Sequence, residues 1–174
     1  CERAAGHAQT LGSSYPMPSY FPSLLFLALP WAPPLLAQVG TPPDSTELTL
    51  LGLGLEADSA EVVYALGRPD SVRSYEHPHN VGAHLLTLYY GNALVFIGPD
   101  GLKNGVKVIG RGASTARGLR VGDPIAKALR LYGPPDERAH AELRWSIGGQ
   151  YNPLLVVEVQ DGHVTSIFAG YAID

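Results

Sequence analysis

The densest group of potential metal ligands is the run Glu76-His77-Pro78-His79-Asn80, with His84 a few residues further on. Neutral imidazoles two positions apart on an extended segment can both face one ion, and Glu76 or His84 could complete the ligand set. A solvated loop is the simpler interpretation, because no supporting second set of residues is recognisable beside the histidines. Metal binding through this segment therefore stays an alternative.

Other catalytic chemistry has little support in the sequence. No serine lies in a Gly-x-Ser-x-Gly elbow, and Gly110-Arg111-Gly112 lacks the lysine of a phosphate-binding loop. Carboxylates for acid–base catalysis would have to come from Asp136, Glu142 and Glu158, which no motif places in one cleft. We expect Glu158 to form a cross-strand ion pair with Arg144 instead. The sequence thus predicts a protein that is not an enzyme and needs no cofactor, with a hydrolase of dispersed site as a further alternative.

Composition limits the partners that the chain can have. It has 174 residues, of which 45% are hydrophobic, and a net charge of -4, so it can bury one ordinary core. Its 12 Lys and Arg residues are scattered rather than gathered in a basic stripe, which argues against nucleic acid as a partner. The single cysteine, Cys1, excludes an internal disulfide and a paired-cysteine zinc site.

The N-terminal part of the chain differs from the rest. The apolar run from Phe21 to Leu36 is interrupted by prolines and is too short to span a bilayer, so we expect no stable membrane span in the mature chain. We interpret residues 1–37 as an upstream segment and a signal peptide that starts at Met17, and residues 38–45 as a Pro-rich linker. A disordered leader and an anchored or lipidated terminus are the alternatives.

The remaining sequence contains a repeat. An offset of 66 positions aligns the tetrapeptides Gly67-Arg68-Pro69-Asp70 and Gly133-Pro134-Pro135-Asp136. Each tetrapeptide follows a helical pattern of about ten residues whose inward positions recur at helical spacing. These positions are Ser59, Val62, Val63 and Leu66 in the first pattern and Ile125, Ala128, Leu129 and Tyr132 in the second. Asp58 with Glu61 resembles a capping box, and Asp123 before Pro124 resembles an N-cap. We expect repeat units at residues 46–111 and 112–174 within a single globular domain.

Strand patterns follow each tetrapeptide. Leu143, Trp145 and Ile147 alternate with polar residues, and we expect Trp145 to lie in the core. Asp-Gly pairs at 100–101 and 161–162 predict hairpin turns. The predicted fold class is α+β, in which two tandem helix-plus-three-strand repeats form an antiparallel sheet covered on one face by helices. The first unit is five residues longer between its two aspartates, and we assign the extra length to the histidine segment.

A family resemblance adds to these patterns. Gly-Leu-Arg-Val-Gly-Asp at 118–123, Gly-Pro-Pro-Asp at 133–136 and Asp-Gly-His-Val-Thr-Ser-Ile at 161–167 resemble the repeat shared by the β-lactamase inhibitor protein and the BamE (SmpA/OmlA) envelope lipoproteins. The resemblance implies a secreted or envelope module that binds protein through the open face of its sheet or its loops. In the inhibitor family an acidic hairpin residue enters the target enzyme, and Asp100 occupies the similar position, although Asp-Gly is also ordinary turn chemistry.

We therefore expect an exported, periplasmic or secreted, non-catalytic module that binds a protein partner in the cell envelope or outside the cell. The candidate protein-binding residues are Tyr89, Tyr90, Asp100, Arg144 and Glu158. Because adjacent strand residues point to opposite faces, one of Tyr89 and Tyr90 should be exposed. The main alternative is an exported metal- or small-ligand-binding protein that uses Glu76, His77, His79 and His84.

Overall fold

The computed structural model describes residues 40–77, 80–148 and 153–171. The chain divides into residues 1–35 and residues 36–174, and every described residue belongs to the second unit. The signal-peptide prediction at residues 1–37 lies outside the described residues, as does His79.

Three short helices occur in the described part of the chain: the 3-10 helix η1 (Ser45–Gly52), α1 (Ser59–Leu66) and α2 (Ile125–Tyr132). The capping box of α1 is confirmed, since Glu61 N donates to Asp58 Oδ1 at 2.8 Å and Asp58 N donates to Glu61 Oε2 at 3.0 Å. Gly67 and Gly133 end α1 and α2 with φ of 82° and 75°, which favours glycine. Each of these two α-helices has 8 residues, slightly fewer than expected.

The predicted N-cap of α2 is wrong. Pro124 is the cap residue, in an extended conformation with ψ of 145°, and it makes no side-chain capping bond. Asp123 lies one position too early, and its Oδ2 accepts from the backbone N–H of Arg120 at 2.8 Å and from Lys127 Nζ at 2.7 Å. Its carboxylate therefore closes the preceding turn and reaches the first turn of the helix through Lys127.

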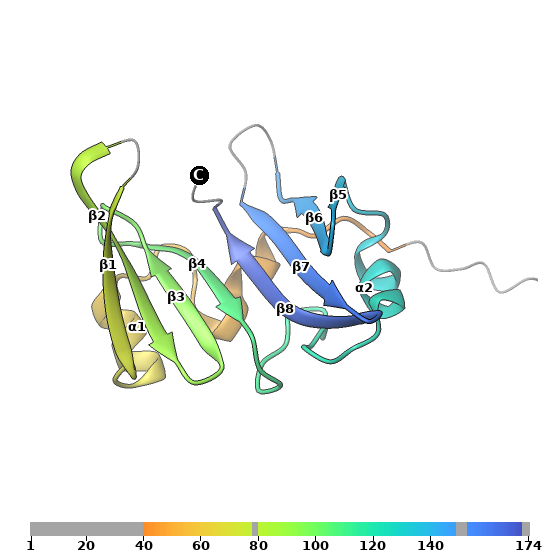
Figure 1. Cartoon of the computed structure of the whole chain (residues 1–174), viewed down its shortest axis with the longest axis horizontal. Coiled ribbons are helices and arrows are strands. Elements are labelled where there is room, and N and C mark those ends of the chain that lie inside the picture. The colour runs from red at the N-terminus through yellow and green to blue at the C-terminus, as the bar shows by residue number, and fades with distance from the viewer. Residues whose placement is uncertain (1–39, 78–79, 149–152, 172–174) are drawn as a thin grey trace, which may run out of the picture. The chain divides into compact units, whose positions relative to one another are not determined.

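The described strands form one eight-stranded antiparallel sheet in the order β1-β2-β3-β4-β8-β7-β6-β5 (Figure 1). The first four are β1 (Ser71–His77), β2 (Asn80–Tyr90), β3 (Ala93–Ile97) and β4 (Lys103–Val108). The other four are β5 (Glu137–Ala139), β6 (Glu142–Ser146), β7 (Leu154–Gln160) and β8 (His163–Gly170). Strands β4 and β8 pair with each other, so the two halves of the chain meet in the middle of the sheet.

This architecture overturns the predicted fold class of two helix-plus-three-strand repeats. Four described strands follow each of α1 and α2, and all eight strands belong to one sheet. The strands missed by the pattern are the edge strands β1 and β5, which begin directly after Asp70 and Asp136. A strand that pairs on one side only and lies largely exposed does not need alternating apolar residues, so the sequence of β1 gives no such signal.

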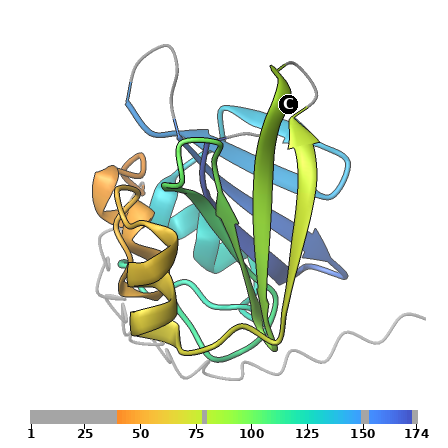
Figure 2. The same ribbon diagram turned by 90° about the vertical axis from the view of Figure 1, so that its left-hand side faces the viewer.

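Helices cover one face of the sheet, where the core lies (Figure 2). Leu50 of η1, Val62 of α1 and Tyr132 of α2 pack into one cluster with inward strand residues such as Val95 and Leu155. Trp145 is buried in this cluster, as its periodicity predicted. Val63 is 39% exposed, so the predicted inward face of α1 was too broad. In the described residues no helix is long and apolar enough to cross a membrane.

The segment predicted as a linker is docked where the structure describes it. Arg117, in the connection between β4 and α2, donates to the carbonyl oxygens of Thr41 and Pro42 at 2.6 and 2.9 Å. Its guanidinium also pairs with Asp44 at 2.8 Å and with Glu47, whose side chain is fully buried, at 3.3 Å. Residues 41–47 are therefore part of the packed structure.

Candidate functional site

The face of the sheet opposite the core is not covered by any described helix, and we call it the open face (Figures 1 and 2). Strand alternation fixes which side chains reach it: Val106 and Val108 of β4 point into the core, so Lys107 points to the open face. By the same alternation Phe168 of β8 and Arg144 of β6 lie on the open face.

One row of cross-strand neighbours crosses the whole open face. In order from β1 to β5 the row comprises Ser71, Tyr89, Leu94, Lys107, Phe168, Val156, Arg144 and Glu137. Two residues that the sequence singled out for binding, Tyr89 and Arg144, thus lie in one row at opposite ends of the sheet. Glu158 lies in the neighbouring row and is joined to this one through Lys107.

Aromatic side chains cluster on the open face of β1, β2, β3 and β8. The hydroxyl oxygens of Tyr75 and Tyr89 are 3.4 Å apart, and the guanidinium carbon of Arg73 lies 5.3 Å from the centroid of the Tyr89 ring. Phe96 and Phe168 meet edge to face with ring centroids 5.9 Å apart. We call Tyr75, Tyr89, Phe96 and Phe168 the aromatic cluster.

A pair of glycines lies at the join between the halves, and one of them makes room for the ring of Phe168. Gly105 of β4 and Gly170 of β8 are cross-strand partners. A Cβ atom on Gly105 would lie 2.7 Å from Phe168 Cε2, closer than such atoms approach. The glycine at 105 therefore leaves space for the ring of Phe168 beside Phe96, the other cross-strand neighbour of Gly105.

An apolar cavity of about 360 Å³ opens beside the aromatic cluster. Its lining comprises Tyr75, Glu76, Leu85, Leu86, Thr87, Tyr89 and Phe96. Leu85 is buried but lies outside the main core cluster, on the same side of β2 as Tyr89. A hollow with aromatic walls and an aliphatic floor is suited to an apolar side chain of a binding partner.

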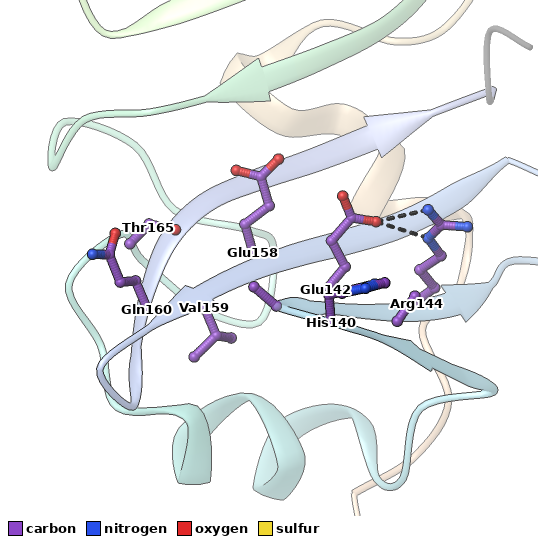
Figure 3. A pocket seen from close by; sticks show the side chains of 9 residues that line it. His140, Glu142, Arg144, Glu158, Val159, Gln160 and Thr165 are labelled. Atoms are coloured by element: carbon purple, nitrogen blue, oxygen red, sulfur yellow. Dashed lines mark hydrogen bonds and ion pairs between the residues drawn. The ribbon is translucent and has the colours of Figure 1, made fainter.

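A charged cavity of about 480 Å³ lies near the β5 end of the sheet (Figure 3). Glu142 and Glu158 are cross-strand partners that point to one side of the strands, whereas Val159 points to the other. Arg144 Nη2 donates to Glu142 at 2.7 Å, and Lys107 Nζ donates to Glu158 at 2.6 Å. Each carboxylate in the cavity thus has its own cation.

These pairs set the protonation of the cavity. Desolvation acts to raise the pKa of Glu158, but the hydrogen bond from Lys107, the hydroxyl of Ser166 and the charge of Lys107 together outweigh it and hold that pKa below its ordinary value. The hydrogen bond to Glu142 raises the pKa of Arg144. The predicted ion pair between Arg144 and Glu158 is wrong, because the register places Val156 opposite Arg144 and brings Lys107 to Glu158.

The other two predicted binding residues lie away from this surface. Tyr90 packs against the core cluster on the helix-covered side, and its hydroxyl donates to Gly67 O at 3.2 Å. Tyr89 and Tyr90 thus lie on opposite faces as expected, although both are half-buried. Asp100 is exposed in the β3–β4 turn, where its Oδ1 accepts from Leu102 N at 3.0 Å. Its carboxylate is engaged in the turn itself.

The described residues of the histidine segment lie in β1 and β2, which are longer than the corresponding strands β5 and β6. Glu76 and His84 are cross-strand neighbours. Glu76 Oε1 accepts from Gly82 N at 3.2 Å, and His84 Nδ1 is 3.3 Å from Ser74 Oγ. Within the ranges that the structure describes, no three His, Cys, Asp or Glu side chains are close enough to hold a metal ion.

Several open-face residues were not predicted from the sequence, namely Arg73, Tyr75, Phe96 and Lys107. Lys107 carried a usable signal, since it stands between two valines in an alternating run. Arg73 and Tyr75 carried none, because β1 has no apolar alternation. The pairing of Phe96 with Phe168 depends on the β4–β8 join, which no local pattern specifies.

Comparison with known proteins gives little. No protein-family model matches the chain, and no curated protein matches it. An extracellular protein containing an SCP domain, from Bacillus anthracis str. Ames, shows a partial structural likeness with 5% sequence identity and a TM-score of 0.49. The likeness covers 67% of this chain and 44% of that one, and at this level it carries no information about function.

Proposed function

We propose that this chain is an exported, non-catalytic protein-binding module whose partner docks on the open face of the sheet. The observation that carries the proposal is the aromatic cluster on a sheet face that no described helix covers. Tyrosine and arginine are enriched among the residues that dominate binding energy at protein interfaces, and phenylalanine is enriched in the composition of such interfaces. The export part of the proposal is supported by the signal-like pattern of residues 17–37.

The contacts on the open face also favour binding over catalysis. The charged groups of the row are held in ion pairs, Lys107 with Glu158 and Arg144 with Glu142. Paired groups keep fixed charges and fixed positions, which suits recognition and reduces the entropy lost on docking. Proton transfer would instead need a group with a pKa near neutrality, and pairing moves that of Glu158 away from it.

The partner can be sought by affinity capture from envelope and extracellular fractions of the source cells, with the full chain as bait. We expect the unchanged chain to retain a partner protein. The double variant Tyr75→Ala, Tyr89→Ala should retain that protein at least about tenfold less well, because truncation of an interface tyrosine costs about 1 kcal/mol or more of binding free energy. Direct titration of that protein would then measure the same loss.

The matched control is Tyr64→Ala, which removes a tyrosine that is 94% exposed on α1, on the helix side of the sheet. This variant should retain the partner as well as the unchanged chain does. Equal retention by the open-face variant, with circular dichroism showing an intact fold, would contradict the proposal. Failure to enrich any protein would contradict it as well.

A further inference from the structure

Strand β1 is an edge strand with one free side. In the described residues it pairs only with β2, and all its residues except His77 are exposed. The opposite edge of the sheet is β5, which has only 3 residues. Shortness is one of the ways in which proteins protect a sheet edge from pairing with another strand. Proline on the strand is another such protection. Strand β1 has 7 residues and no proline, so it has neither protection.

The charged side chains of β1 are drawn back from the free edge. Arg73 lies over the ring of Tyr89 on β2, and Glu76 accepts a hydrogen bond from the backbone N–H of Gly82, also on β2. Both charged groups are therefore engaged by β2 of the same chain. Here apolar surface remains on the strand instead, since Val72 is 53% exposed and Tyr75 is 46% exposed.

The sequence of β1 is complementary to itself in one antiparallel register. If two copies of β1 pair about a two-fold axis perpendicular to the sheet, the two sheets continue with the same faces on the same side. Residues that oppose each other across the axis must then point to the same face of the sheet. With the axis at Ser74, Arg73 opposes Tyr75 of the second copy and Val72 opposes Glu76. With the axis at Arg73, two arginines would oppose each other, and with the axis at Tyr75, Arg73 would oppose His77. Only the register centred on Ser74 places Arg73 of each copy opposite the Tyr75 ring of the other copy. In this register no two side chains of like charge oppose each other.

We propose that β1 pairs with β1 of a second copy of this chain about a two-fold axis at Ser74, which joins two sheets into one. The second copy is the occupant that the observations favour, because in this register Arg73 and Tyr75 of one strand oppose Tyr75 and Arg73 of the other and no like charges meet. The pairs would extend the contact between Tyr75 and Tyr89 across the interface. This association would place the two open faces side by side. Tyr75 belongs to both surfaces, but self-association of the chain is measured without the partner of the open face.

Sedimentation of the full chain over a concentration series tests the proposal. We expect a monomer–dimer equilibrium for the unchanged chain. Tyr75→Arg places arginine opposite Arg73 of the other copy twice and should weaken the dimer at least about tenfold. Adding Arg73→Glu to it sets glutamate opposite arginine in the same register and should restore most of the association. The rescue is specific to the axis at Ser74, because other registers do not bring these positions together.

Tyr64→Arg is the matched control, since it makes the same change on an exposed position of α1 and should leave the dimer unchanged. Thermal unfolding of each variant separates loss of association from loss of fold. A chain that sediments as a monomer throughout would overturn the proposal. So would a dimer that Tyr75→Arg leaves intact, or a folded double variant that fails to regain association. Binding of an added peptide to β1 of a monomeric chain would assign the edge to a different partner and would also overturn it.

Discussion

At the scale of single residues, Lys103 is a charged side chain that lies in a buried environment. It is 2% exposed at the start of β4, and its ammonium donates to the carbonyl oxygens of Leu48 and Leu53 at 3.2 and 2.8 Å. These bonds hold η1 and the residue after it against the sheet. Burial lowers the pKa of Lys103 from 10.5 to about 8, because the charged form loses its hydration.

This pKa predicts that stability rises with pH. Between pH 8 and 10.5 the unfolded chain binds more protons at Lys103 than the folded chain does, so the free energy of unfolding increases through that range. From pH 7 to pH 9.5 we expect a gain of about 2 kcal/mol, measured by urea unfolding of the full chain. In Lys103→Met the gain should disappear. In the matched control Lys127→Met it should persist, and a pH profile that is the same for both variants would contradict the assignment.

At the scale of elements, Arg117 joins the start of the described chain to the end of α2. Besides its contacts to residues 41–47, its Nη1 donates to Leu131 O at 3.3 Å, and its guanidinium carbon lies 5.3 Å from the centroid of the Tyr132 ring. Glu47 is buried beneath it and accepts a hydrogen bond from the Tyr132 hydroxyl at 3.0 Å. That hydroxyl is also 2.6 Å from Thr115 Oγ1, so four side chains form one buried network.

Removal of Arg117 should destabilise the fold strongly, because it leaves the carboxylate of Glu47 buried without its cation. For Arg117→Ala we expect the free energy of unfolding to fall by about 3 kcal/mol. Arg120→Ala, which truncates an exposed arginine nearby, should change it by less than about 0.5 kcal/mol. Chemical denaturation of both variants measures the difference. A loss for Arg117→Ala no larger than that for Arg120→Ala would show that the network does not hold the segment.

Elements whose signals are local could be predicted from the sequence, and elements defined by pairing could not. The capping box at Asp58, the terminal glycines of α1 and α2 and the inward alternation around Trp145 depend on near neighbours, and the sequence displays them. Edge strand β1 and the partners of Arg144 and Glu158 depend on register between distant segments. The buried charges of Lys103 and Glu47 are invisible for the same reason, since their partners are 50 or more positions away.

The candidate site follows the same division. Arg144 and Glu158 stand in strand-like sequence, and alternation was enough to place them on the face away from the core. For Tyr89 and Tyr90 alternation predicted opposite faces but not which of the two lies on the open face. The aromatic cluster brings together Tyr75, Phe96 and Phe168 from three different strands, and only the strand order makes them neighbours. A surface assembled across a sheet is therefore recognised late, when the order of its strands is known.

At the scale of the whole sheet, the β4–β8 pairing decides whether the two halves behave as one body. Val106 and Val108 of β4 are cross-strand partners of Ala169 and Ile167, and all four lie in the common core cluster. The backbones approach closely at the glycine pair, because a Cβ atom on Gly170 would lie 2.3 Å from Gly105 Cα. A shared core and a continuous ladder predict that β3 and β7 unfold together.

We therefore expect hydrogen exchange to show the same opening free energy for β3 and β7, equal to the global free energy of unfolding from circular dichroism. Gly170→Ala should lower that global free energy of unfolding by about 2 kcal/mol, since the added methyl group would force β4 and β8 apart. The φ of Gly170, 156°, is also unfavourable for a residue with a side chain. The substitution should also let β7 exchange through a separate opening of lower energy, because the ladder is interrupted between the halves. Gly112→Ala, where a Cβ atom meets open space, serves as the control and should change neither quantity measurably. If β3 and β7 opened independently in the unchanged chain, the halves would be separate folding units and the join would be a contact rather than part of the core.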